Sequence, residues 1–122
     1  MENYIDLMKQ VSELSDSALE GLEHVKQMLN EGNIESALIL SGDFTQAFYQ
    51  MEKTCGLIAK NQLSDELRNQ TISLRESINV LVSAFEVSQY SRAQEVIQFN
   101  VLPAYKKWQS LLQGDFRQYI LN

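Results

Sequence analysis

A short turn phrase occurs twice in this 122-residue chain, and the two copies lie 56 positions apart. The first copy is Gly32-Asn33-Ile34 followed by Ala37, and the second is Ser88-Gln89-Tyr90 followed by Ala93. Outside the turns, Leu29 corresponds to Phe85 and Tyr49 to Tyr105. Because each copy separates two long segments of helical periodicity, the chain is predicted to consist of two helical hairpins laid end to end.

Heptad-spaced apolar residues predict helices over residues 2–30, 34–60 and 65–87, and a fourth from about residue 91. Gly32 suits the left-handed position that ends the first helix, and Ser64 and Ser91 are candidate N-terminal caps for the third and fourth. Gly21 falls in the apolar stripe of the first helix, which predicts close approach of a neighbouring helix there. Pro103 lies inside the last apolar pattern, so a kink or short break is expected at that position.

Composition supports an all-α domain that spans residues 1–122. Hydrophobic residues make up 44% of the chain and there is one proline, so a packed core is expected and the regular turn signals of a β-rich fold are missing. Short links between long amphipathic segments predict an antiparallel up-down-up-down four-helix bundle. The first hairpin covers 2–60, the second 64–113, and an apolar tail covers 115–122. The tail is expected to fold over the bundle end or to dock on another chain.

The charge of the chain narrows the partners it can bind. The net charge is −6, which argues against nucleic acid and against anionic membrane surfaces. Residues 1–43 carry nine acids and two bases, while residues 44–122 carry seven acids and eight bases. The acidic first part is interpreted as a solvated helix face, with steering of a basic partner as the alternative.

One cysteine, Cys55, rules out an internal disulfide, and its place on an apolar row indicates a small buried hydrophobe rather than a reactive thiol. The first residues lack the basic region and apolar run of a secretion signal, and no apolar stretch approaches the ~20 residues needed to span a bilayer. A cytoplasmic location is expected.

No arrangement of residues in the sequence predicts catalysis, and no cofactor is expected. His24, the single histidine, has Glu20 one helical turn before it, a weak metal-ligand pair without the third and fourth ligands that zinc requires. Glycine-rich phosphate loops are absent. We therefore expect a protein without enzymatic activity.

Partner binding is the remaining prediction. The small–aromatic–small row Gly42, Tyr49, Gly56 suits a close helix contact, for example with a second copy of the chain. Aromatic or apolar residues near the C-terminus form a second candidate surface. The residues of this second surface are Tyr105, Phe116, Tyr119 and Ile120. Ordinary core packing is the alternative for each of them.

Three functional hypotheses follow. The first is a helical bundle for protein–protein interaction, through self-association or as an adaptor. The second comes from a resemblance: the segment from Phe85 to Trp108 and the acidic helical hairpins resemble flagellar export chaperones, which implies binding of an amphipathic client helix. The third is a metal- or ligand-binding bundle that uses His24 and Glu20. The turn phrase also resembles that of tetratricopeptide-type hairpins.

Overall fold

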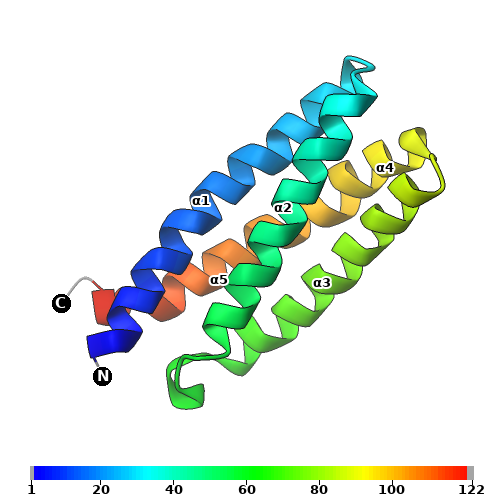
Figure 1. Ribbon diagram of the computed structural model, residues 1–122. Coiled ribbons are helices and arrows are strands. Elements are labelled where there is room, and N and C mark those ends of the chain that lie inside the picture. Colours follow the sequence, from blue (N-terminus) through cyan, green and yellow to red (C-terminus); the bar gives the residue numbers. More distant parts are fainter. Residues whose placement is uncertain (1, 121–122) are drawn as a thin grey trace.

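The computed structural model describes residues 2–120 and consists of helices joined by short turns (Figure 1). In chain order the elements are α1 (Glu2–Asn30), α2 (Ile34–Cys55), the 3-10 helix η1 (Lys60–Gln62), α3 (Asp65–Glu86), α4 (Tyr90–Val96), the π-helical segment η2 (Ile97–Val101) and α5 (Leu102–Ile120). The described residues contain no strand. The all-α prediction is confirmed.

The helices alternate in direction, so the N- and C-terminal ends of the chain lie at the same end of the molecule (Figure 1). α1 and α2 form the first hairpin, and α3 pairs with the continuous fourth helix made of α4, η2 and α5. α1 also packs along α5, whereas the backbones of α2 and α3 come close at few places. The up-down-up-down bundle is confirmed, with one seam, between α2 and α3, wider than the others.

The two hairpin turns have the same backbone geometry, as the 56-residue repeat predicts. Gly32 has φ of 77° and Ser88 has φ of 59°, both in the left-handed region. The next residues match as well, with φ and ψ of −86° and 78° at Asn33 and −91° and 75° at Gln89. Each of these two residues donates its N–H to the carbonyl five positions back at 2.8 Å, which closes the preceding helix.

The predicted caps had different outcomes. Ser64 caps α3 as expected, because its hydroxyl accepts a hydrogen bond from the Leu67 N–H at 3.1 Å. Ser91 does not cap the fourth helix. That helix begins at Tyr90 after Gln89, whose side chain makes no capping hydrogen bond. The repeated turn, and not a serine hydroxyl, determines where the helix starts.

α2 ends at Cys55, five residues before the predicted end. Gly56 follows as the C-cap, and the N–H groups of Leu57 and Ile58 donate to carbonyls three residues back, so the chain tightens into a turn. This turn still buries Ile58, which is 4% exposed. Apolar spacing alone could not distinguish a helix that continues to residue 60 from one that ends at Cys55, because Ile58 is expected to be buried in both.

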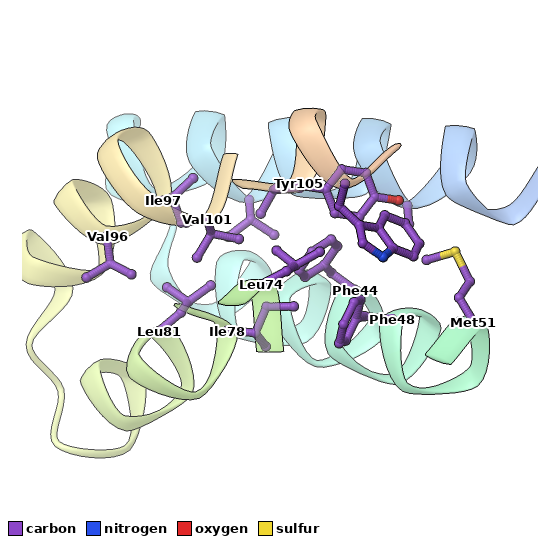
Figure 2. Close-up of a cluster of buried hydrophobic side chains, with 14 of the residues drawn as sticks. Phe44, Phe48, Met51, Leu74, Ile78, Leu81, Val96, Ile97, Val101 and Tyr105 are labelled. Atoms are coloured by element: carbon purple, nitrogen blue, oxygen red, sulfur yellow. The ribbon is translucent and has the colours of Figure 1, made fainter. Parts of the chain in front are cut away.

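Aromatic side chains occupy the middle of the core. Phe44 and Phe48 of α2 lie against Tyr105 and Trp108 of α5, with ring centroids 5.6 Å apart for Phe44–Tyr105 and 5.8 Å apart for Phe48–Trp108. Figure 2 shows that labelled side chains from α2, α3 and the fourth helix point toward one another. Each buried polar aromatic atom has a partner: the Tyr105 hydroxyl donates to the Ser15 carbonyl at 2.7 Å.

The π-helical segment η2 changes the register of the second hairpin. Up to Ile97, equivalent buried residues of the two hairpins lie 56 residues apart, as Ala37 and Ala93 do. Beyond η2 they lie 57 residues apart, as Phe48 and Tyr105 do. A π turn holds one extra residue, and here the Leu102 N–H donates to the carbonyl of Ile97, five residues back. The predicted equivalence of Tyr49 and Tyr105 is therefore wrong, since Tyr49 is 41% exposed and Tyr105 is fully buried.

The break expected at Pro103 is confirmed in position, and its form is this π turn. Proline has no N–H to donate, and its ring disfavours a regular α-helical turn immediately before it. The turn that precedes Pro103 is the π-helical one, so the helix continues through the proline into α5.

Two expectations about glycine are wrong. α5 does not end at Gly114 but runs to Ile120, so residues 115–120 of the predicted tail extend the bundle helix, while residues 121–122 lie outside the described range. Gly21 does not mark a close helix contact, because a Cβ atom built there would meet nothing within 4 Å. Its backbone lies too far from the neighbouring helices for the missing side chain to matter.

Candidate protein-binding groove between α2 and α3

The seam between α2 and α3 is held by side chains that reach across it. The Tyr49 hydroxyl lies 3.2 Å from Oδ1 of Asn79, and Arg75 donates two hydrogen bonds to Oε2 of Glu52, the one from Nε at 2.7 Å. These bridges cross a seam at which the backbones of α2 and α3 come close at few places, and the hollow found along it lies at one end. We call this seam the α2/α3 groove.

One end of the α2/α3 groove opens into a pocket of about 310 Å³, bounded by the C-terminal turn of α2, η1 and the first turns of α3. Most of its wall is apolar, and Thr71 adds little polarity because its hydroxyl already bonds the Leu67 carbonyl and the Trp108 indole. The apolar wall residues are Cys55, Ile58, Leu63, Leu67 and Ile72. We call this hollow the Cys55–Ile72 pocket.

Charged side chains form the rim of the Cys55–Ile72 pocket. They are three bases, Lys60, Arg68 and Arg75, and one acid, Glu52. Arg68 is fixed at the rim, because Nη1 donates to the Lys60 carbonyl at 3.0 Å and Nη2 to Oδ1 of Asp65 at 2.5 Å. The hydrogen bonds that Arg75 donates to the Glu52 carboxylate raise the pKa of the Arg75 guanidinium, which stays charged. The rim carries a local excess of positive charge on an acidic protein.

Cys55 is a half-buried wall residue and not an activated nucleophile. Burial, and then the neighbouring Glu52 carboxylate, raises the pKa of the Cys55 thiol from 9.0 to about 12. A thiol with this pKa is protonated at neutral pH and reacts slowly. The predicted role as a small hydrophobe agrees with this position, except that part of the side chain faces the pocket.

The predicted row Gly42, Tyr49, Gly56 lies along the α2/α3 groove. All three residues are exposed, and Tyr49 makes the bridge to Asn79. A Cβ atom at Gly42 would meet nothing within 4 Å, and one at Gly56 would meet only carbonyls of its own helix end. Gly42 is therefore not needed for packing within the chain, whereas a Cβ atom at Gly56 would lie 3.2 Å from the Lys53 carbonyl oxygen.

The other predicted partner residues lie elsewhere. Tyr105 and Phe116 are fully buried, so the fold leaves neither side chain accessible to a second protein. Tyr119 and Ile120 are half-buried against the core, and Phe116 and Ile120 line a shallow hollow beside Lys9 of α1. The C-terminal residues thus pack on their own bundle, because α5 continues far enough to reach α1.

Sequence reasoning missed the α3 side of the groove. Ile72 is 46% exposed and stands among polar residues in the first half of α3, outside the heptad rows that mark the core. Leu57, next to Gly56, is 60% exposed. An isolated isoleucine on a polar helix face was the available signal, but a single exposed apolar residue is common on protein surfaces.

A larger hollow of about 630 Å³ lies between α3 and the fourth helix beside Phe99, which is 68% exposed. Six of its nine lining residues are polar or charged, among them Glu76, Arg92 and Glu95. The α2/α3 groove is therefore the better candidate for apolar recognition, because its wall is the more apolar of the two.

His24 and Glu20 are both exposed on α1. Within residues 2–120, no three His, Cys, Asp or Glu side chains are grouped so that they could hold a metal ion. None of the helices in this range has the length and apolar character needed to span a membrane.

Comparison with known proteins identifies the family of the chain. Residues 6–111 match the family model described as a domain of unknown function, DUF8042. No curated protein and no solved structure matches the chain.

Proposed function

We propose an adaptor function for this chain, which belongs to the DUF8042 family. In this function the protein binds an amphipathic helix of a partner protein in the α2/α3 groove and catalyses no reaction. The observation that carries the proposal is the apolar Cys55–Ile72 pocket, which opens at the one seam where the bundle helices stand apart.

A helix suits this groove better than an extended peptide. The groove runs between two antiparallel helices and offers no unpaired strand edge for an added strand. α2 has 22 residues, which corresponds to about 33 Å of helix at ~1.5 Å per residue. A Cβ atom at Gly42 of α2 would meet nothing within 4 Å, and the exposed side chain of Ile72 supplies an apolar contact at the pocket end.

Binding without catalysis also agrees with the side chains in the groove. A general base or nucleophile needs a pKa near the working pH, whereas the pKa of the Cys55 thiol is about 12. Glu52 is engaged by Arg75. The remaining rim groups, Lys60 and Arg68, are suited to pairing with anionic side chains.

A different protein is a better-supported partner than a second copy of the chain. The C-terminal residues that motivated self-association pack on their own bundle, with Phe116 fully buried. The Tyr49 row lies along a groove, whereas a two-fold dimer needs a surface complementary to itself.

Site-specific photo-crosslinking in the native host cell tests the adaptor function. In the test variant a photoreactive phenylalanine analogue replaces Ile72 in the groove. In the matched control it replaces Lys107, an exposed residue of α5. The expected result is an adduct from position 72, and not from 107, whose partner peptide lies in an amphipathic helix of another protein. An adduct with a second copy of this chain, or no adduct from position 72, contradicts the proposal.

We further assign the protein to the cytoplasm. The chain has a single cysteine, and Cys55 is a free thiol, as in proteins of reducing compartments. Cell fractionation followed by immunoblotting tests this assignment, and recovery in an extracytoplasmic fraction would contradict it.

A further inference from the structure

We infer that the Cys55–Ile72 pocket receives a bulky apolar side chain that has an acidic group beside it, so the helix that occupies the groove is acidic at this end. The inference rests on the adaptor function proposed above and names the chemistry of its partner. Charge complementarity between the pocket rim and the occupant carries it.

The size of the pocket suits an anchoring side chain. Its volume of about 310 Å³ is at the lower limit of the ~300–1,000 Å³ typical of ligand pockets. The wall is apolar, and the hydroxyl of Thr71 is already satisfied by Leu67 and Trp108. Filling the pocket with an apolar group therefore leaves no wall hydroxyl without a partner, and it removes the exposed surface of Ile72 from water.

The rim decides the charge of the occupant. Glu52 compensates Arg75 and Asp65 pairs with Arg68, which leaves Lys60 as the rim base without a carboxylate partner among the described residues. The carboxylate partner of Arg68 is Asp65, whose side chain is 90% exposed. An exposed pair of this kind contributes about 0–1 kcal/mol, so a partner carboxylate can replace it at little cost.

The overall charge makes this local selection specific. The chain carries −6, and nine of its sixteen acids lie in residues 1–43, on α1 and the first part of α2. A uniformly acidic partner is repelled by that part of the surface. A helix whose acidic group lies next to its apolar anchor meets the bases of the rim at the Cys55–Ile72 pocket end of the groove.

Trp108 provides a built-in reporter. It is the single tryptophan of the chain, and its indole N–H donates to Thr71, a wall residue of the pocket, at 2.9 Å. Energy transfer from Trp108 to a fluorophore in the pocket therefore reports occupancy in the unlabelled full-length protein.

The first test compares two fluorophores that share a ring skeleton and differ in charge. Anilinonaphthalene sulfonate is anionic, and phenylnaphthylamine is its neutral counterpart. The wild-type chain is expected to bind the anionic probe more tightly. Replacing the two rim bases other than Arg75 (Lys60→Gln with Arg68→Gln) weakens binding of the anionic probe by about three- to tenfold and leaves binding of the neutral one unchanged. Ile72→Asn weakens the binding of both probes, whereas Arg92→Gln, at the hollow beside Phe99, changes the binding of neither.

The second test uses a designed amphipathic helical peptide of about 16 residues, or ~24 Å of helix, with one tryptophan-sized apolar anchor. One version has glutamates a turn before and after the anchor, and the matched version has lysines there. The acidic version is expected to bind at least tenfold more tightly, and this preference disappears when Lys60 and Arg68 are both replaced by glutamine. Equal binding of the two peptides overturns the inference.

The two proposals fail separately. If a helix of another protein is cross-linked at position 72 but the chain shows no preference for anionic probes or acidic peptides, the adaptor function stands. The inference that the partner helix carries an acidic group beside its apolar anchor is then overturned. If the chain binds the anionic fluorophore selectively but binds neither peptide and yields no cross-linked partner, the pocket is a site for small apolar anions. This outcome contradicts both proposals.

Discussion

Ser15 and Thr71 occupy equivalent positions in the two hairpins, 56 residues apart, and each hydroxyl accepts a hydrogen bond from a side chain of α5. Thr71 Oγ1 receives the indole N–H of Trp108 at 2.9 Å, and Ser15 Oγ receives the amide N–H of Gln109 at 3.1 Å. Trp108 and Gln109, neighbours in α5, are thus held by equivalent positions of the two hairpins. The repeat supplies matched sites for α5 on both of its sides.

The two hydroxyls are predicted to differ in their contribution to stability. Thr71→Val leaves the buried Trp108 N–H without a partner, and an unsatisfied buried donor costs about 1–3 kcal/mol. Ser15→Ala costs less, because Gln109 still donates to Asp16 Oδ1 at 2.9 Å. Urea unfolding followed by Trp108 fluorescence measures both changes. A larger loss for Ser15→Ala would contradict the assignment of the bonds.

The two turns are predicted to respond in opposite ways to equivalent substitutions. Ser88 has φ of 59°, so Ser88→Gly relieves strain and raises stability by about 0.5–1 kcal/mol. Gly32 has φ of 77°, so Gly32→Ala lowers stability by about the same amount. Thermal unfolding of both variants checks this. Two changes of the same sign would show that the turns are not equivalent.

The π turn is predicted to be a one-residue insertion that can be removed. Deleting the exposed Asn100 together with Pro103→Ala should convert η2 into a regular α-helix and keep the core residues of α5 in place. The double change is needed because proline does not fit the interior of a regular helix. The expected result is a folded protein within about 1–2 kcal/mol of wild type, measured by urea unfolding.

The matched control for this deletion is loss of the exposed Ser110 in the regular part of α5. That deletion rotates all later residues by about 100°, which moves the fully buried Leu112 and Phe116 out of the core. Each such loss costs about 2–5 kcal/mol, so this variant is expected not to fold. Equal tolerance of the two deletions would show that η2 does not set the register.

Stability is predicted to fall at alkaline pH, in part through Cys55. The pKa of its thiol is about 12 in the folded chain and 9.0 for the ordinary group, so the unfolded state loses its proton first as pH rises. The stabilisation is present below pH ~9 and is lost between pH ~9 and ~12. Burial raises the pKa of Tyr105 as well, which acts in the same direction.

The measurement is the urea midpoint at a series of pH values from about 8 to about 10.5, for wild type and Cys55→Ala. The midpoint should fall less steeply in Cys55→Ala, and a residual slope should remain from Tyr105. Identical slopes for the two proteins would mean that the Cys55 thiol is not desolvated in the fold.

The sequence by itself determined the elements that depend on neighbouring residues. The end of α1 at the Gly32 turn, the Ser64 cap and the place of the interruption before Pro103 follow from local backbone conformation and hydrogen bonding. Apolar periodicity determined the bundle, because each amphipathic stripe has to be buried against another.

Only the tertiary structure decided the register after Ile97 and the position of the groove. A π turn shifts the core face by one residue, and the choice between Tyr105 and its neighbours depends on which side chains pack against Phe44 and Phe48 (Figure 2). The width of the α2/α3 seam depends on how large side chains from four helices share one interior, a balance that no single helix encodes. For this reason Tyr49 could be recognised from the sequence as a surface residue, while Ile72 and the pocket beside it could not.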